Sequence, residues 1–385
     1  MYNIQYRKII DIGQRIVTGK TPSTKESENF SDDYPFITPS DIPSYWEKFI
    51  AHTERGISIK GSKCLRGYML PKDSICVVCI GSTIGKMCFT HKDCYTNQQI
   101  NSIVPKEEYN AHYLFYLIRF LKGYFQLIGG GTGSGKGIVN KTTFSKIRLP
   151  VLTSRKVQNK IASILSTYDD LIEKNNRKIA ILQEMAEELY KEWFVRFRFP
   201  GYKTAKFQKG IPEGWQVDKI KNRIKRLPFN RLYKESDVLE DGKVVVIDQS
   251  EDDYLGYHNN EPSHVASYAE PICLFGDHSC KFKLMTYPFS LGENVVPFKG
   301  NNINSYYLFY STHKIIETEE YKRHWGLFVS KKILIPPMVL QRNFEKHLVT
   351  IHKQIDTISN GQRLLIKQRD LLLPRLMSGK LEVKV

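Results

Sequence analysis

The stretch ILSTYDDLIEKNNRKIAILQEMAEELYKEWF, residues 164–194, decides the fold of this 385-residue chain. Its apolar positions alternate steps of three and four residues, the spacing of a helix face that packs against another helix. This seam consists of Leu165, Tyr168, Ile172, Asn175, Ile179, Leu182, Ala186 and Leu189. The spacing predicts one long helix with a coiled-coil face.

The same spacing returns near the end of the chain. The second seam consists of Phe344, Leu348, Ile351, Ile355, Ile358, Gln362, Leu365, Arg369, Leu372 and Leu376. Asn175 and Gln362 are polar residues at almost the same place in the two seams, and such residues fix register and partner at a cost in stability. We therefore expect an antiparallel helix pair with a globular part at each end. The alternative is that each helix only covers the sheet of its own half.

Outside the helices, the chain repeats itself. YNAHYLFYLIRF (residues 109–120) is similar to INSYYLFYSTHK (residues 303–314), and SKIRLP ending at Pro150 matches KKILIP ending at Pro336. The second match sets an offset of 186 residues, which in the helices pairs Asp170 with Asp356. We infer two copies of a module of about 190 residues, much longer than the repeats of solenoid proteins.

Between the helices, short apolar runs such as SICVVCI, KVVVIDQ and EPICLF are broken by Gly, Pro, Asn and Asp. This pattern predicts strand-rich domains, with some helix over residues 109–126. The fold class is therefore α+β: two strand-rich domains joined by two long helices in an antiparallel coiled coil, with a pseudo-twofold internal repeat. We place the first domain at 1–153, a central helical region at 154–198, the second domain at 199–338 and a C-terminal helical region at 339–385.

The charge of the chain indicates a polyanionic partner. Lys and Arg number 57 against 40 Asp and Glu, a net charge of +17, and the pI is near 9.3. A protein this basic most often binds nucleic acid. No apolar run approaches the roughly 18 residues that span a bilayer, and the N-terminus does not resemble a secretion signal. With seven cysteines, an odd number, we expect a cytoplasmic protein with free thiols and no membrane association.

A glycine-rich segment, GGGTGSGKG at residues 129–137, contains the pattern G-x-x-x-x-G-K. A phosphate-binding P-loop needs Ser or Thr after the lysine and a strand before the loop. Here Gly137 follows Lys136, and a predicted helix precedes the loop. The pattern therefore disfavours nucleotide hydrolysis. It leaves two interpretations: a mobile loop that meets a DNA phosphate through Ser134 and Lys136, or a plain flexible connector.

Two further patterns could indicate chemistry. Cys76 and Cys79 form C-x-x-C, but they lie in an apolar run that predicts a strand, where positions three apart point to opposite faces. We expect buried thiols there and no metal site. Asp241-Gly242-Lys243 has the D-x-K pattern of some nucleases but lacks a separated acidic partner, and Asp-Gly is an ordinary hairpin signal. No catalytic centre emerges.

Polar and basic residues recur in the loops of both copies. Asn, Gln, Arg and Asp can read base edges, while Lys and Ser mainly hold phosphates. The candidate DNA-binding residues of the first copy are Lys20, Thr21, Thr38, Ser40, Asp41, Ser82, Thr83, Lys86, Asn97, Gln98 and Gln99, besides Ser134 and Lys136. Those of the second copy are Asn230, Arg231, Tyr233, Asp277, His278, Ser279 and Lys281.

Several stretches together resemble the specificity (S) subunits of Type I restriction-modification systems. IVTGKTPSTKESENF, YPFITPSDI, GSTIGKMCF and TNQQINSIVPK look like the first target recognition domain of that family, and ILQEMAEELYKEWFVRFRFPG looks like its central conserved region. IPEGWQVDKI is similar to the start of the second recognition domain, GDHSCKFKLMTYPFSLGENVVPF to its loop region, and QRDLLLPRLMSGKLEV to the C-terminal conserved helix. The Gly-rich loop holds more glycine than the family pattern.

The resemblance implies a non-catalytic subunit that binds double-stranded DNA, each recognition domain reading one half of a bipartite asymmetric target. It also implies two methylation subunits that use S-adenosylmethionine, and motor-nuclease subunits that use ATP and Mg²⁺, with no cofactor in this chain.

On the same basis, helix packing or partner contact is assigned to a set of helix residues. They are Ile172, Asn175, Ile179, Leu182, Met185, Leu189, Tyr190, Trp193, Phe194, Ile358, Gln362, Leu365, Leu371, Leu372, Leu376 and Met377. Two alternatives remain for the chain as a whole: an enzyme with its own P-loop ATPase or nuclease activity, and a basic scaffold for an acidic protein.

Overall fold

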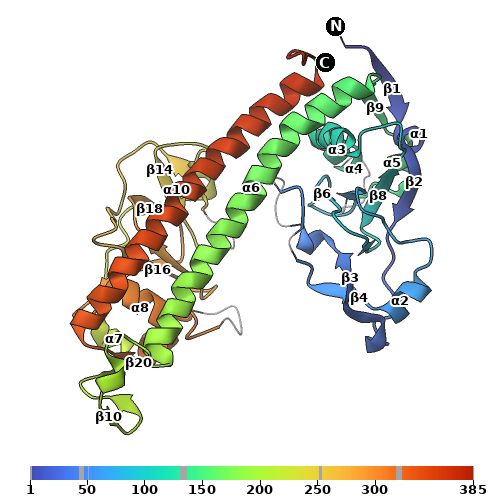
Figure 1. The fold of residues 1–385 in the computed structure, drawn as a ribbon. Coiled ribbons are helices and arrows are strands. Elements are labelled where there is room, and N and C mark those ends of the chain that lie inside the picture. Colours follow the sequence, from blue (N-terminus) through green and yellow to red (C-terminus); the bar gives the residue numbers. More distant parts are fainter. Residues whose placement is uncertain are drawn as a thin grey trace. The chain divides into compact units, whose positions relative to one another are not determined.

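The computed structural model describes residues 2–42, 47–50, 52–130, 137–250, 254–317 and 323–384 (Figure 1). The chain divides into two compact units. Unit 1 comprises Met1–Asn176 and Asn360–Val385, and unit 2 comprises Arg177–Ser359. Two long helices, α6 (Arg155–Tyr190) and α10 (Met338–Met377), each contribute one part to each unit.

Unit 1 contains two small sheets and a two-stranded ribbon. The four-stranded sheet has the order β2-β8-β5-β6, the three-stranded sheet the order β4-β3-β7, and the ribbon joins β1 to β9. The strands are β1 (Ile4–Lys8), β2 (Gly13–Thr18), β3 (Phe30–Ile37), β4 (Arg55–Ile57), β5 (Ile75–Val78), β6 (Met87–Phe89), β7 (Tyr95–Thr96), β8 (Ile100–Pro105) and β9 (Arg148–Leu152). The short helices are α1 (Ile9–Ile12), α2 (Ile59–Cys64), α3 (Ala111–Phe120), α4 (Lys122–Gly130) and α5 (Lys141–Lys146).

Unit 2 repeats this topology strand for strand. Its sheets have the orders β13-β19-β16-β17 and β15-β14-β18, and its ribbon joins β12 to β20. The strands are β12 (Gln216–Lys219), β13 (Ile224–Arg226), β14 (Val244–Ile247), β15 (Gly256–His258), β16 (Ile272–Gly276), β17 (Phe282–Met285), β18 (Phe289–Leu291), β19 (Val295–Gly300) and β20 (Lys332–Ile335). The helices are α7 (Ile220–Arg223), α8 (Ser305–Thr312) and α9 (Trp325–Ser330), and a small hairpin, β10 (Phe207–Gln208) and β11 (Ile211–Pro212), precedes them. The predicted twofold repeat of strand-rich domains is confirmed, including one parallel strand pair per unit, β3 with β7 and β14 with β18.

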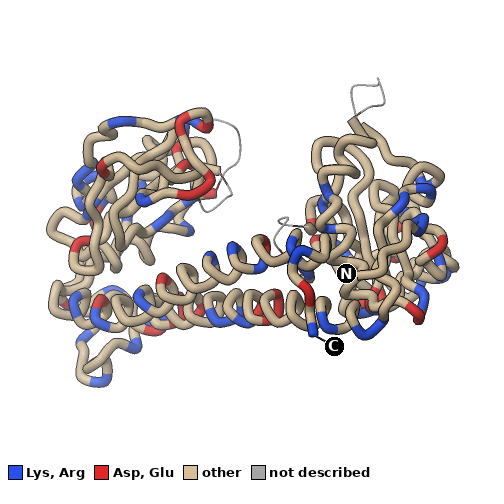
Figure 2. The backbone as a smooth tube through the Cα atoms, turned by 90° about the horizontal axis from the view of Figure 1, so that it is seen from above, with Lys and Arg blue, Asp and Glu red and all other residues tan. Residues whose placement is uncertain are grey.

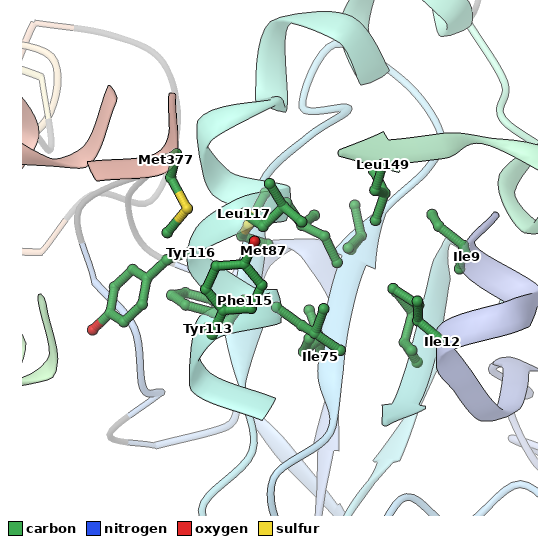
Figure 3. Packing of buried hydrophobic residues seen from close by; sticks show 14 of the residues in the cluster. Ile9, Ile12, Ile75, Met87, Tyr113, Phe115, Tyr116, Leu117, Leu149 and Met377 are labelled. Carbon is green, nitrogen blue, oxygen red and sulfur yellow. The ribbon is translucent and has the colours of Figure 1, made fainter. Parts of the chain in front are cut away.

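The helix that covers each four-stranded sheet begins at an asparagine cap. The Asn110 side chain accepts a hydrogen bond from the Tyr113 amide at the start of α3, and Asn304 accepts from the Tyr307 amide at the start of α8. The apolar residues that follow bury one tyrosine-rich face. Figure 3 shows the result in unit 1, where α3 packs over β5 and β6 together with residues of α1, β9 and α10.

Each unit has a large core under its helices and a smaller one formed by strands of both its sheets, and unit 1 has a third cluster of Phe36, Ile57, Leu65 and Tyr95. In unit 2 the large core includes Ile220, Phe298 and Phe344, and the smaller core includes Leu274 and Phe289. The β5 run ICVV is buried at every position because its two faces line different cores of unit 1. This explains why it reads as a continuous apolar run without alternation.

The two long helices pack antiparallel, as predicted. In unit 1, Arg369 of α10 pairs with Asp169 of α6 at 2.6 Å, and Gln362 Nε2 donates to Asn176 Oδ1 at 2.7 Å. Moving seven residues forward on α10, from Gln362 to Arg369, corresponds to moving seven residues back on α6, from Asn176 to Asp169. This is the relation expected of antiparallel helices. The polar seam residue Gln362 thus contacts Asn176, the neighbour of the seam residue Asn175.

The offset of the repeat within the helices also needs correction. Gln158 and Gln341 make the same pair of contacts: each amide oxygen accepts from the backbone of the cap asparagine, and each Nε2 donates to a carbonyl of the preceding segment. They are 183 residues apart, and so are the buried pairs Ile161 with Phe344 and Leu165 with Leu348.

The predicted offset of 186 is therefore wrong by three residues. Seam positions alternate steps of three and four residues. When the two helix sequences are aligned with a shift of three residues, most seam positions therefore still fall on seam positions, and the apolar pattern still agrees.

None of the helices in the described part of the chain is both long enough and apolar enough to span a membrane.

Candidate nucleic-acid interface

The candidate residues of the first copy lie in loops that meet at one edge of unit 1. The Lys20 amide donates to the Thr96 carbonyl, and the Asn97 amide donates to the Ile37 carbonyl. The Cys79 amide donates to the Gln99 carbonyl. These bonds join the ends of β2, β3 and β5 to the turn between β7 and β8, which gives one continuous loop cluster, named here the unit 1 loop cluster.

Side chains of the unit 1 loop cluster also contact one another. Thr21 Oγ1 donates to Gln98 Oε1 at 2.9 Å, and Asn97 Nδ2 donates to Gln99 Oε1 at 2.9 Å. Lys86 Nζ contacts the Ile42 carbonyl at 3.3 Å. Four of the candidates have exposed side chains: Lys20, Ser40, Ser82 and Gln98. The structure thus holds a polar surface in place through bonds among its own loops.

Thr38 and Asp41 support this edge locally. Asp41 Oδ2 accepts hydrogen bonds from the Thr38 amide and hydroxyl, at 2.7 and 2.6 Å, in a capping box around Pro39–Asp41. Asp41 Oδ1 accepts from the Glu54 amide at 2.7 Å. With both oxygens engaged, Asp41 positions the backbone of the loop, while Ser40 is the exposed residue of the turn.

Unit 2 has an equivalent cluster. The His278 amide donates to Gln249 Oε1 at 3.0 Å, Lys281 Nζ donates to the Ser250 carbonyl at 2.8 Å, and the Asp277 amide donates to the Asn294 carbonyl at 2.8 Å. These bonds join the end of β14, the turn between β16 and β17, and the turn between β18 and β19. This is the unit 2 loop cluster, and by topology its turns correspond to those of unit 1.

The segment after β13 lies beside the end of β18, where the unit 2 loop cluster begins, and it contains a stack of rings. The Arg231 guanidinium lies 4.7 Å from the Tyr233 ring centre, and that ring stacks on His258 at 4.2 Å. The Tyr233 backbone bonds to Leu291. Tyr233 is only 2% exposed, so its assignment as a surface contact is corrected: its ring supports Arg231, while Arg231 and Asn230 are exposed.

Asp277 has a structural role that its sequence context did not indicate. Its Oδ1 accepts hydrogen bonds from the amides of His324 and Trp325, at 3.0 and 2.8 Å, where α9 begins. Carboxylates at helix N-termini are stabilised by the free amides there. This bond links the turn between β16 and β17 to α9.

Three polar residues of the unit 2 loop cluster were missed by the sequence analysis. Asp248 and Gln249 follow β14 directly, as Thr38 follows β3, and Asn294 lies in the turn that corresponds to Asn97. A signal was present, because the polar run Asp248-Gln249-Ser250 follows the apolar run VVVI in the same way that TPSD follows an apolar strand end in the first copy.

Two candidates, Ser134 and Lys136, lie outside the described residues, as does most of the G-x-x-x-x-G-K pattern. Helix α4 precedes this segment, as expected. On its other side, the Gly137 carbonyl accepts from the Gly81 amide at 3.0 Å. The glycine-rich segment is thus anchored to the unit 1 loop cluster where it ends.

The patterns considered for metal or nuclease chemistry have structural explanations. Cys76 and Cys79 are buried in different cores, which confirms that they point to opposite faces, and burial raises the pKa of Cys79 to about 11. Among the described residues, no group of three or more His, Cys, Asp and Glu could hold a metal ion. Asp241-Gly242 does not form the predicted hairpin turn, because the residues on both sides of it, Leu239 and Val244, pair with β15.

Basic residues occur on both units (Figure 2), but the net charge is uneven. Unit 1 holds 30 Lys and Arg against 17 Asp and Glu, a net +13, while unit 2 holds 27 against 23, a net +4. Attraction of a polyanion by unit 2 therefore depends on how its charges are distributed, because its net charge is small.

The predicted helix residues fall into three groups by burial. Half-buried are Asn175, Ile179, Leu182, Leu189, Tyr190, Ile358, Gln362, Leu365 and Leu372. Ile172, Ala186, Trp193, Phe194, Leu376 and Met377 are buried within their own units. Met185 and Leu371 are 54% and 62% exposed, and five other large apolar residues of the two long helices are also exposed: Leu171, Ile181, Met338, Val339 and Leu364. The exposed group is available for contact with another chain, whereas Ala186, Trp193, Phe194, Leu376 and Met377 pack into the cores of their own units.

Comparisons with known proteins agree with this architecture. The family model for the Type I restriction modification DNA specificity domain matches residues 1–184. The MjaIX Type I restriction enzyme specificity subunit of Methanocaldococcus jannaschii is 28% identical over 98% of this chain and 93% of its own length. The HindI specificity subunit of Haemophilus influenzae is 33% identical over 47% of this chain and 39% of its own length. The crystal structure of a Type I S subunit from M. genitalium has the same fold, with a TM-score of 0.58 at 14% identity over 97% of this chain and 96% of that chain.

Proposed function

Because the chain is similar to specificity subunits of Type I restriction-modification systems over nearly its whole length, we propose that it belongs to that family and selects the double-stranded DNA sequence on which such a system acts. Each unit reads one half of a bipartite, asymmetric target through its loop cluster. The chain is the recognition component in the cytoplasm and has no cofactor of its own. Adenine methylation and ATP-dependent cleavage belong to partner subunits that use S-adenosylmethionine, ATP and Mg²⁺.

One observation supports this proposal above the others. The same fold occurs twice, and in both copies polar loops gather at the corresponding edge, with different residues at corresponding positions. After β2 the exposed candidate is Lys20, whereas Asn230 and Arg231 are exposed after β13. In the turn between β7 and β8 it is Gln98, whereas Glu293 and Asn294 are exposed in the turn between β18 and β19. Because these side chains differ, each unit favours a different base sequence, so the target is asymmetric.

The exposed apolar residues of the long helices support docking of two methylation subunits. Ile181 and Met185 lie four residues apart on α6, and Leu364 and Leu371 lie seven apart on α10, so each pair shares a helix face. Apolar residues that share an exposed face are typical of a surface for another protein. The motor-nuclease subunits join through the assembled complex.

Mapping of methylated bases tests the proposal. A host that lacks other restriction systems is given this gene with its methylation partner, and long-read sequencing records every modified adenine. We expect one split motif with two unrelated halves. Methylation without a shared motif, or without dependence on this chain, contradicts the proposal. The enzyme alternative is tested on the purified chain, which should neither hydrolyse ATP nor cut DNA.

A further inference from the structure

Basic and acidic residues of unit 2 are concentrated in separate, adjacent segments of the sequence. Residues 219–234, KIKNRIKRLPFNRLYK, contain seven Lys and Arg and no Asp or Glu. The next nineteen residues, 235–253, contain eight Asp and Glu and one Lys. A unit with a net charge of only +4 thus has one strongly basic segment, named here the basic segment, which is residues 219–234.

The basic segment connects the β12–β20 ribbon with the loop cluster of unit 2. It begins at the end of β12, passes through α7 and β13, and continues to the loop cluster. Its apolar residues anchor it at both ends: Ile220 and Ile224 pack into or against the large core, and Leu227 and Phe229 pack against the smaller core beneath the loops. The segment is therefore held rigidly against the unit.

Its basic side chains face solvent. Six are exposed: Lys219, Lys221, Lys225, Arg226, Arg231 and Lys234. The seventh, Arg223, is half-buried in an ion pair with Asp218 at 2.8 Å and is part of the structure. Within the described residues, none of these six side chains forms an ion pair with Asp or Glu.

Two of the arginines are oriented by aromatic rings. The Arg226 guanidinium lies 4.6 Å from the Phe229 ring centre and 5.8 Å from that of Trp325. Arg231 stacks on Tyr233 in the same way. A stacked guanidinium keeps its N–H donors at its edge, where a planar fork can bind phosphate oxygens.

Unit 1 lacks an equivalent. The corresponding stretch, from Lys8 through β2 to Lys20, contains Asp11, and its one arginine, Arg15, donates to the carbonyls of Gly67 and Met69 at 3.3 and 2.7 Å. Unit 1 has a high net charge instead. The two units therefore attract a polyanion by different means.

We propose that the basic segment is a phosphate-binding track that holds the backbone of duplex DNA beside the unit 2 loop cluster. This inference rests on the proposed DNA-binding function and adds where the sequence-independent contacts of unit 2 lie. The track attracts DNA, while acidic residues that follow it in the sequence, such as Glu235, Asp237 and Glu240, repel it. Phosphate contacts fix register and carry no base specificity.

The experiment compares two triple variants of the full chain with equal loss of charge. One replaces Lys219, Lys221 and Lys225 of the track by Gln, and none of these lies in the loop cluster. The other replaces Lys203, Lys206 and Lys209 by Gln; these are exposed residues around the β10–β11 hairpin. Binding of a fluorescein-labelled random duplex of about 40 base pairs is measured by anisotropy between about 50 and 200 mM KCl.

Each phosphate contact contributes about 0.9 to the slope of log affinity against log salt, so the track variant should lose up to about 2.7. Over this fourfold salt range, the unmodified chain then loses up to about 40-fold more affinity than the track variant. The hairpin variant should keep the slope of the unmodified chain. Equal salt slopes for the two variants would contradict the proposal. They would show either that the three lysines do not contact phosphates or that any loss of positive charge lowers the slope.

A second measurement separates this inference from the proposed function. With the mapped target in place of the random duplex, the track variant should keep the affinity ratio of target over random DNA. If the unmodified chain shows no preference for any target, the proposed function is wrong. The salt dependence of binding to random DNA still tests whether the basic segment contacts phosphates. A changed ratio in the track variant shows that these lysines read bases and overturns their assignment to phosphate.

Discussion

The Arg369 guanidinium donates a 2.6 Å hydrogen bond to Asp169, and both side chains are almost completely buried in unit 1. Tyr116 of α3 donates to the other oxygen of Asp169 at 2.5 Å. Given the 183-residue offset, the equivalents of Asp169 and Arg369 in unit 2 are His352 and Ala186. Tyr310, the equivalent of Tyr116, contacts His352 Nε2 at 3.0 Å. The buried pair that is an ion pair in unit 1, Asp169 with Arg369, is thus replaced in unit 2 by an uncharged pair, His352 with Ala186.

This difference predicts how unit 1 responds to loss of its ion pair. Arg369→Ala leaves a buried carboxylate without its cation, and we expect a loss of about 3–5 kcal/mol in the free energy of unfolding. Adding Asp169→His introduces the pair found in unit 2 and should restore about half of that loss. Urea unfolding of both variants measures the difference. A double variant less stable than Arg369→Ala contradicts the equivalence.

The corrected offset predicts equal effects for two glutamines. Gln158→Ala and Gln341→Ala each remove two hydrogen bonds that join the start of a long helix to the cap of α3 or α8. Each should cost about 2–4 kcal/mol, because buried backbone groups lose their partners. Hydrogen exchange should show the loosening in unit 1 for the first variant and in unit 2 for the second. Lys160→Ala, at an exposed position two residues further along α6 than Gln158, is the control and should change little.

Burial of His352 predicts a stability that depends on pH. Desolvation lowers the pKa of His352 to about 4, although Asp356 nearby favours the charged form. In the unfolded chain the pKa is near 6.5. As the pH falls from about 6.5 towards 4, the unfolded chain therefore takes up a proton that the folded chain does not, and the free energy of unfolding decreases.

Between about pH 6.5 and 5 this loss should be about 2 kcal/mol for one histidine. His352→Gln should remove that part of the pH dependence, measured as the urea midpoint at several pH values. His112 in unit 1, whose pKa burial also lowers to about 4, keeps its own contribution. His52→Gln, at an exposed histidine, should leave the profile unchanged. Parallel profiles for His352→Gln and the unmodified chain show that this group does not titrate as stated.

The sequence predicted what depends on local pattern. The spacing of the seam residues predicted the long helices, and the similar segments around Tyr113 and Tyr307 predicted the repeat. Both predictions depend only on residues that are close together in the sequence. The burial of Tyr233 was not predictable in this way, since it depends on stacking against His258, 25 residues further on. The three-residue slip was hidden for a related reason: the pattern of a seam is nearly the same after a shift of three residues, and only the contacts of Gln158 and Gln341 distinguish the two offsets.

Independent reading by the two units predicts that loop changes act on one half of the target. Replacing Asn97, Gln98 and Gln99 by Ala removes the amides of the turn between β7 and β8, including the Gln98 oxygen that accepts from Thr21. The methylated motif should lose or relax one half and keep the other, because each base contact contributes about 1–3 kcal/mol of discrimination. Replacing Gln249 and Asn294 of unit 2 by Ala is the matched change and should affect the opposite half. Long-read maps of methylated bases for both variants provide the measurement. Because the two loop clusters share no described residue, a variant that alters both halves would show that the units do not read DNA independently.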